Sequence, residues 1–283
     1  MKSADPFHMR PQWDALLAIY KEFARVCDKH ELRYWFMEGN AIGSLRHKGF
    51  VPWDDDIDVA MPRPDYERFR DMASSELPDY LRFWDWRDMD DWRFTFGKIQ
   101  DVREAKVLEV ESAVGHKLSN GLYIDILVID GYPEGRISRW IYDLRMLSYG
   151  SVVRYLQTTF MCQTLLGKFA WLYGCLCSVL LNVHCIRRVQ EKIDALMKSI
   201  PFETAKTTWR AGAAIRVTMT FPRAVWNGSV MKEFDEIEVP LPVGYDTYLR
   251  TQYGEYMTLP PKEKQVPSHS LPYRFPWWLG PKS

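Results

Sequence analysis

The sequence has no excess of charge of either sign. Lys and Arg together number 37, and Asp and Glu together also number 37. A protein that binds nucleic acid polymers needs a basic surface facing the phosphates, so we do not expect such a partner. The balanced charge does not exclude a site for one small nucleotide.

Cysteine is also scarce, at five among 283 residues. A chain of this length can bury a sizeable core without disulfide bonds, and the odd number indicates reduced thiols and a cytosolic compartment. Cys175, Cys177, His184 and Cys185 lie close together in the sequence. Their surroundings are apolar and contain no paired Cys-x-x-Cys motif, which argues against a structural zinc site.

The first thirteen residues, MKSADPFHMRPQW, contain no apolar core, so we do not expect a secretory signal. One uncharged run covers eighteen residues, 169–186. Its length is at the lower limit for a membrane span, and it includes polar Asn182 and His184. We favour a core or lobe helix in a cytoplasmic protein. A helix on the cytoplasmic membrane face and a true span are the alternatives.

Hydrophobic periodicity predicts both helices and strands. Apolar residues recur at helical spacing across 11–31, and the nearly continuous apolar run at 122–129 is the clearest strand. Further expected elements are strands at 33–37, 57–61, 94–99 and 106–111, a short helix within 39–49, a helix at 64–74, a helical lobe at 137–200 and a C-terminal block at 207–275. We expect one domain over 1–283, with its catalytic core at about 33–135.

Four carboxylates occupy the six positions of WDDDID, from Trp53 to Asp58. Side chains alternate between the two faces of a strand, so Asp56 and Asp58 should lie side by side, with Asp54 less surely aligned. Carboxylates this close repel one another unless a proton or a cation intervenes. Oxygen-only ligands suit Mg²⁺ or Mn²⁺.

The alternative to a metal site is a solvated acidic surface. Two features favour the metal site: the acids adjoin an apolar strand, and they follow a turn region rich in glycine and basic residues. Glycine lets a backbone approach phosphates, and basic side chains neutralise them. The residues concerned are Gly39, Gly43, Gly49, Arg46, His47 and Lys48.

Asp125 is a lone charge within the strand LYIDILVI. An ionised side chain should not be buried there without a partner, so Asp125 is a candidate third metal ligand. The alternative is an Asp bonded to backbone or to an Arg. Asp130 follows at the end of the same strand and is expected to open the turn before Gly131.

Several segments together resemble one known family. MEGNAIGSLRHKGFVPWDDDIDVAMPRPDYERF resembles the signature of the LicD family of phosphotransferases, whose eukaryotic relatives include fukutin. The Phe96-Gly97-Lys98 segment, NGLYIDILVIDGYPEG and the block from FDEIEV to KQVPSH follow in the family's order. The resemblance covers 33–270, most of the chain.

The resemblance implies an α+β fold: a nucleotidyltransferase-like mixed β-sheet with flanking helices and an added helical lobe. It also implies that Asp56, Asp58 and Asp125 are catalytic and hold the metal, while Gly39 with Asn40 contacts the nucleotide. Asn40 departs from the usual Thr or Ser. An amide can still donate to a phosphate oxygen, so the departure puts only the need for a hydroxyl in doubt.

The implied reaction moves phosphocholine from CDP-choline onto a sugar hydroxyl of teichoic acid or lipopolysaccharide. The glycan acceptor could be lipid-linked, with peripheral membrane contact through 169–186. Related members move ribitol phosphate. Two alternatives stay open: transfer of NMP from an NTP to a small molecule or protein, and a non-catalytic glycan-binding module.

Other residues are candidates for binding the donor. Asp58 or Asp125 could act as the base. A choline group would favour an aromatic cage, for which the sequence offers Trp53, Trp226, Tyr253 and Tyr256. The sequence does not choose among them, and for any single one packing in the core is the more general expectation. The candidates for phosphate contacts are Arg46, His47, Lys48, Lys98 and His269.

Overall fold

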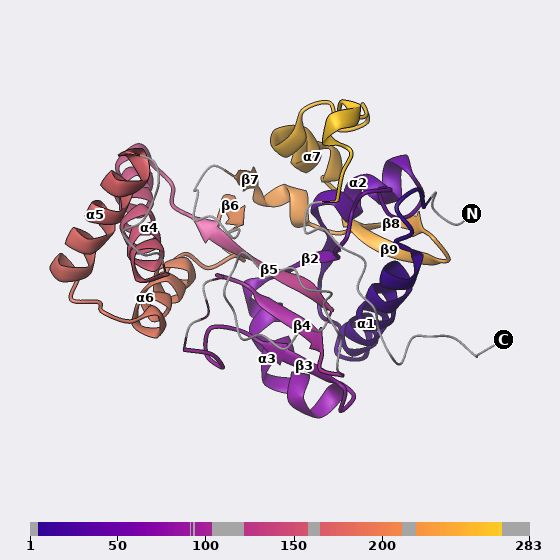
Figure 1. The fold of residues 1–283 in the computed structure, drawn as a ribbon, viewed down its shortest axis with the longest axis horizontal. Helices are drawn as coiled ribbons and strands as arrows, with labels where there is room; N and C mark the ends of the chain where they lie inside the picture. Colours follow the sequence, from indigo (N-terminus) through magenta and orange to yellow (C-terminus); the bar gives the residue numbers. More distant parts are fainter. Residues whose placement is uncertain are drawn as a thin grey trace. The chain divides into compact units, whose positions relative to one another are not determined.

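The computed structural model describes residues 5–90, 92, 94–103, 122–157, 165–210 and 219–267. Helices and strands both contribute to the fold, so the α+β prediction is confirmed (Figure 1). The chain divides into two compact units. The first unit consists of 1–83, 98–126 and 224–283, and the second of 84–97 and 127–223. The prediction of one domain with four parts stays a prediction.

The described strands form one mixed sheet and one hairpin (Figure 1). The main path of the sheet runs β1-β2-β5-β4-β3, and β6 pairs with β5 on one side and with β7 on the other. Strands β8 (Ser229–Phe234) and β9 (Ile237–Pro242) form the hairpin. The sheet strands are β1 (Trp35–Phe36), β2 (Asp58–Pro62), β3 (Leu81–Trp84), β4 (Gly97–Asp101), β5 (Tyr123–Tyr132), β6 (Thr207–Arg210) and β7 (Thr220–Pro222).

Strand β5 is longer than the sequence predicted. It continues through Asp130 and Gly131, which lie opposite Trp209 and Thr208 of β6. The expectation that Asp130 opens a turn is therefore wrong. Gly131 suits the strand for a different reason: a Cβ at this position would come within 2.5 Å of the carbonyl oxygen of Ile200. Glycine allows that close approach.

An aromatic core fills the first unit. Helix α1 (Arg10–Lys29) buries its apolar face, including Phe23, whose ring packs against Tyr34 and Phe69. Burial of this kind gives many of the aromatic residues a packing role. The other helices of the unit are α2 (Glu38–Arg46), α3 (Arg63–Glu76) and α7 (Tyr245–Tyr253).

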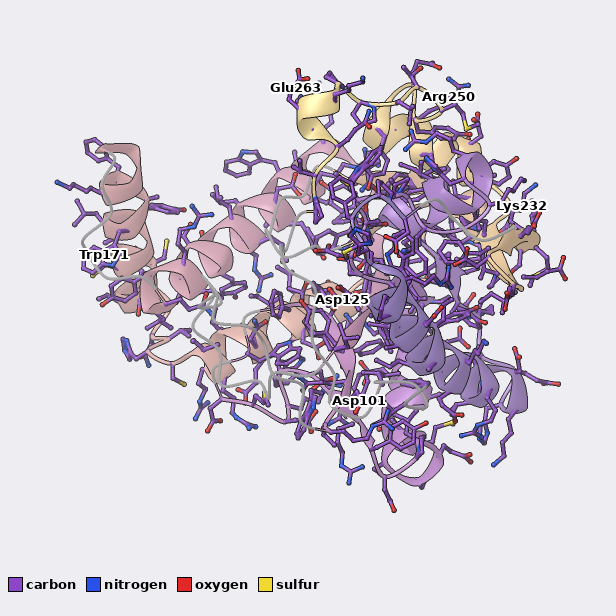
Figure 2. All side chains as sticks on the ribbon, turned by 45° about the vertical axis from the view of Figure 1, so that its right-hand side comes forward. Asp101, Asp125, Trp171, Lys232, Arg250 and Glu263 are labelled. Carbon is purple, nitrogen blue, oxygen red and sulfur yellow. The ribbon has the colours of Figure 1, made fainter. Side chains whose placement is uncertain are left out.

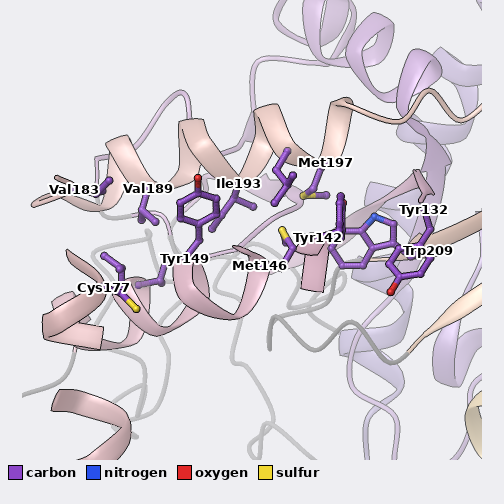
Figure 3. Packing of buried hydrophobic residues seen from close by; sticks show 13 residues of the cluster. Tyr132, Tyr142, Met146, Tyr149, Cys177, Val183, Val189, Ile193, Met197 and Trp209 are labelled. Carbon is purple, nitrogen blue, oxygen red and sulfur yellow. The ribbon is translucent and has the colours of Figure 1, made fainter. Parts of the chain in front are cut away.

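The second unit has its own core, drawn in Figure 3. Met146 of helix α4 (Arg136–Gln157) and Ile193 of helix α6 (Ile186–Lys198) are buried in it, together with Trp209 of β6. Buried apolar side chains of this kind stabilise a fold by roughly 1.5–3 kcal/mol each. The predicted helical lobe at 137–200 is thus three helices with a core.

Helix α5 (Leu165–Leu180) corresponds to the uncharged run of the sequence. Across the described residues, none of the helices combines the length and the apolar character that crossing a bilayer requires. The helix belongs to a lobe as expected, but it is not a core helix, because most of its large apolar side chains are exposed.

The remaining differences are local. The predicted strands at 57–61 and 94–99 are shifted, to 58–62 and 97–101. The strand predicted at 106–111 lies outside the described residues. The C-terminal block contains the β8–β9 hairpin in addition to the expected helices and loops. Its turn, Asp235-Glu236, lacks the glycine that usually marks a tight hairpin.

Gly43 offers a test of how α2 packs. A Cβ there would lie 2.3 Å from the carbonyl oxygen of Gly49. Alanine would normally favour a helix, but this backbone contact cannot move cheaply, so we expect Gly43→Ala to lower the free energy of unfolding by about 1–3 kcal/mol. Chemical denaturation would measure the change.

Gly228→Ala is the matched control, because a Cβ there meets nothing within 4 Å. We expect a change of no more than about 0.5 kcal/mol. Equal effects of the two substitutions would contradict the packing described for α2.

Candidate active site

The backbone of the acidic segment is held from two helices. Asn40 of α2 is fully buried. Its amide donates to the carbonyl of Asp56 over 2.9 Å and accepts from the N–H of Asp58 over 2.6 Å. From α1, Trp13 Nε1 and Gln12 Nε2 donate to the carbonyls of Asp54 and Asp55 over 2.8 and 2.7 Å. These bonds fix the segment through its main chain.

The carboxylates of the segment converge. Asp54, Asp55 and Asp56 each offer an oxygen, and these oxygens all lie within 4.8 Å of one another. Burial raises the pKa of Asp54, and the neighbouring Asp56, Asp55 and Glu38 raise it further. Like charges in a poorly solvated site disfavour ionisation in this way. The structure therefore adds Asp54 and Asp55 to the acidic group that the sequence predicted.

Asp58 and Asp125 approach the same group from adjacent strands. The N–H of Asp125 on β5 donates to the carbonyl of Ile57 over 2.8 Å, directly before β2. Burial raises the pKa of Asp58 well above its usual range, with Asp56 and Asp125 as the next causes. The set Asp56, Asp58 and Asp125 stays the predicted metal site, since each of the three interacts electrostatically with another member.

Glu38 is an acid that the sequence analysis missed. It is the first residue of α2 and has a backbone φ of 47°, a region that costs most residues energy. Its carboxylate accepts hydrogen bonds from Gln252 and Tyr253 of α7. Burial of the Tyr253 hydroxyl and the charge of Glu38 raise the pKa of that phenol. Glu38 also contributes to the raised pKa of Asp54 and Asp58.

No local pattern could have identified Glu38. It precedes Gly39 in a short helix, and its partners lie more than two hundred residues along the chain. The sequence suggested Tyr253, which lies 215 residues from Glu38, only as a candidate for a choline cage. Its bond to Glu38 now gives α7 a place beside the acidic group.

A carboxylate of the acidic segment lies beside Gly39. A Cβ there would lie 2.2 Å from a carboxylate oxygen of Asp54. Glycine at this position leaves room for that carboxylate. Contact between Gly39 or Asn40 and a phosphate stays a prediction, although both polar atoms of the Asn40 amide already bind the main chain of the acidic segment.

Lys98 of β4 pairs with one of the acids. It is 4% exposed, and its Nζ lies 2.5 Å from Asp125 Oδ1. The same ammonium lies 3.6 Å from the ring centroid of Tyr123. Asp125, labelled in Figure 2, thus has a cationic partner inside the protein. This partly realises the alternative in which Asp125 is bonded within the chain, with a Lys instead of an Arg.

The three basic residues at the end of α2 and directly after it have distinct environments. Arg46 donates to the carbonyls of Tyr256 and Thr258 over 2.8 and 3.1 Å. Burial and the adjacent Arg46 lower the pKa of His47 to about 4, so this imidazole is neutral at physiological pH. Lys48 is exposed. Their phosphate contacts stay predictions, while that of His269 lies outside the described residues.

The aromatic candidates also differ from one another. Trp226 is buried between Trp35 and Tyr248 and belongs to the core. Tyr256 is buried and donates its hydroxyl to Asp246. Trp53 is half-buried and Tyr253 is exposed. These last two are the better placed to meet a ligand.

A family comparison covers this acidic group. The model described as LicD/FKTN/FKRP, nucleotidyltransferase domain matches residues 31–142, which include Glu38, Asp58, Lys98 and Asp125. We call residues 31–142 the LicD-type domain after the model that they match. The resemblance inferred from the sequence is thereby confirmed.

Similarity to a curated relative extends beyond the LicD-type domain. The chain is 28% identical over 273 residues to the lipopolysaccharide cholinephosphotransferase LicD of Haemophilus influenzae, covering 92% of this chain and 96% of that protein. Uncharacterised proteins of Rickettsia prowazekii and Rickettsia typhi are 23% and 24% identical to this chain, in each case over 50% of its length. The aligned regions cover 49% of the Rickettsia prowazekii protein and 41% of the Rickettsia typhi protein.

Repulsion between Asp58 and the neighbouring carboxylates predicts how the free energy of unfolding depends on pH. Because the pKa of Asp58 is raised in the fold, stability of the metal-free protein should fall as pH rises above about 4, the ordinary Asp value. Asp58→Asn removes that charge and should raise the unfolding free energy at neutral pH by roughly 1–3 kcal/mol. Thermal unfolding in a chelator from acidic to neutral pH would measure it.

Asp71→Asn is the control, since the Asp71 side chain is 76% exposed. We expect the control to follow the wild type at every pH. A metal-free Asp58→Asn protein that is less stable than wild type at neutral pH would show that this carboxylate makes net favourable contacts.

Proposed function

We propose that the protein transfers phosphocholine from CDP-choline to a sugar hydroxyl of a lipopolysaccharide glycan. The observation that carries this proposal is the match to a lipopolysaccharide cholinephosphotransferase over 92% of the chain. The converging carboxylates supply a site of the kind that such a reaction needs. A teichoic acid is the alternative acceptor, and ribitol phosphate is the alternative group transferred.

The chemistry of the donor set fits a divalent cation. Asp54, Asp55 and Asp56 present only carboxylate oxygens, and their mutual repulsion with Asp58 favours an added positive charge. Mg²⁺ and Mn²⁺ prefer such ligands. Together with Asp58 and Asp125, these residues would hold the ion, which would neutralise the donor diphosphate and the leaving CMP.

Asp58 is the better candidate for the base. Asp125 is already engaged, because its Oδ1 pairs with the ammonium of Lys98. The raised pKa of Asp58 makes it a stronger proton acceptor. In the proposed step Asp58 takes the proton of the acceptor hydroxyl. The hydroxyl oxygen bonds to the phosphorus that carries choline, and the bond from that phosphorus to the bridging oxygen breaks, so that CMP leaves.

The donor headgroup would meet aromatic side chains. Trp53 follows the loop before the acidic segment, and Tyr253 is held beside the site through Glu38. Aromatic faces attract quaternary ammonium groups. We propose these two as the aromatic contacts for choline. Trp226 and Tyr256 are buried and serve packing and hydrogen bonding within the protein.

The name of the matching domain also favours a second candidate, transfer of NMP from an NTP. The two reactions differ in their products. Phosphocholine transfer releases CMP, whereas nucleotidyl transfer releases pyrophosphate. A glycan-binding module would release neither product.

The test incubates the protein with CDP-choline, Mg²⁺ and a lipopolysaccharide oligosaccharide freed of its acyl chains, and quantifies CMP and choline-modified glycan. We expect both products in equal amounts. Asp58→Asn should lower kcat by about 100-fold or more, because positioned proton transfer contributes on that scale, while Asp71→Asn retains full activity.

Parallel reactions with CTP and ATP separate the alternatives. Pyrophosphate release from either one, without turnover of CDP-choline, would replace the proposed reaction by nucleotidyl transfer. Glycan binding without any product, unchanged in Asp58→Asn, would favour the binding module.

A further inference from the structure

Two helices of the second unit expose an unusual amount of apolar surface. On α5, large side chains are exposed at the i, i+3, i+4 and i+7 spacing, with Phe169 61% exposed. On α4 the same spacing recurs, with Trp140 65% exposed. The exposed set comprises Ile137, Trp140, Ile141, Leu144 and Leu147 on α4, and Phe169, Leu172, Tyr173, Leu176, Val179 and Leu180 on α5. We call this set the α4–α5 apolar face.

The helices use other positions to pack against each other. Gly174 of α5 lies against α4, where a Cβ would come within 2.3 Å of the carbonyl oxygen of Ser151. Tyr155 and Trp171 pack edge to face with ring centroids 4.9 Å apart. Figures 1 and 2 show α5 beside α4. The contact between these helices therefore leaves the apolar face uncovered by described residues.

The charges around this face have one dominant sign. Helix α4 contains four arginines and a single acid, Asp143, which accepts a hydrogen bond from Tyr132 over 2.7 Å. Helix α5 contains Lys168 and no acid. Two further arginines open α6. Of these, Arg187 pairs with Asp90 over 2.6 Å, and Arg139 of α4 lies 3.7 Å from Glu134, so Arg136, Arg145, Lys168 and Arg188 carry the argument. Cations beside an apolar stripe complement a layer of anionic headgroups above acyl chains.

These observations favour a lipid surface over other occupants. A protein partner or a second copy would have to supply acids against the cations, and the helices of this face offer almost none of their own. Trp140 and Tyr173 are of the residue types that settle at the level of lipid headgroups. At 1.5 Å per residue, α5 with its 16 residues is about 24 Å long, which suits a helix that lies in the interface instead of spanning it.

We propose that the α4–α5 apolar face docks on an anionic membrane surface. The biological role of this docking rests on the proposed function, because docking would bring the transferase to a lipid-linked glycan acceptor. The face itself lies outside the acidic group, so docking and chemistry can be lost separately.

Vesicle flotation tests the proposal with the full-length protein. Wild type should float with vesicles that contain phosphatidylglycerol and much less with phosphatidylcholine alone. The double variant Leu176→Glu/Leu180→Glu places charge on the face and should lower the partition coefficient by about tenfold or more. Leu259→Glu is the matched control, because Leu259 is 54% exposed in the first unit, and it should float like wild type.

A charge variant tests whether the cations beside the apolar face contribute to binding. Arg145→Glu/Lys168→Glu keeps the apolar side chains and should reduce flotation with anionic vesicles while leaving the weak binding to phosphatidylcholine unchanged. Circular dichroism and thermal unfolding would confirm that each variant is folded. Wild type that does not float, or a Leu176→Glu/Leu180→Glu variant that floats as well as wild type, would overturn the proposal.

Two further readouts distinguish the possible failures. Transfer to the acyl-free oligosaccharide should be equal in wild type and in Leu176→Glu/Leu180→Glu, whereas transfer to acylated acceptor in vesicles should fall in the variant. If wild type transfers phosphocholine to neither acceptor, the proposed transferase function is contradicted and the proposed membrane docking is not. Sedimentation equilibrium that gives a dimer in wild type and a monomer in the variant, without flotation, would assign the face to a second copy.

Discussion

Negative charges held within a few ångströms of one another in a partly buried site repel strongly, and the first unit is organised around that repulsion. Its effect appears as the raised pKa of Asp54 and Asp58, each caused by burial and by neighbouring acids. The chain resists it through the main chain. Asn40, Trp13 and Gln12 all bind backbone groups of the acidic segment. The carboxylates can therefore converge without having to hold the loop together.

The same constraint explains neighbouring features of the site. Gly39 lacks a side chain because the Asp54 carboxylate occupies that space. Lys98 pairs with Asp125 and so compensates one of the negative charges. Glu38 accepts two hydrogen bonds from α7, which ties the C-terminal helix to the acids. In the proposed reaction a divalent cation would remove the remaining repulsion when the donor binds.

Sequence patterns predicted the parts of this site that depend on neighbours along the chain. The run of acids before an apolar strand and the lone charge in LYIDILVI drew attention to Asp56, Asp58 and Asp125, whose role as metal ligands stays a prediction. Strand alternation did not predict that Asp55 joins the group, because β2 begins only at Asp58. The roles of Glu38 and Arg46 could not be predicted, because their partners on and after α7 lie more than two hundred residues away. The contact of Asn40 with the nucleotide stays a prediction, and the bonds of its amide to the backbone of the acidic segment were not foreseen. The exposure of α5 was also missed, since an apolar run is equally consistent with a core helix and a surface helix.

A titration with Mn²⁺, followed by the electron paramagnetic resonance signal of the free ion, tests the central claim most directly. Converging carboxylates predict saturable binding by wild type, weakened by about tenfold or more in Asp54→Asn, and unchanged in Asp71→Asn. Binding that does not saturate, or that is equally strong in Asp54→Asn, would contradict the account of these acids as a cation site.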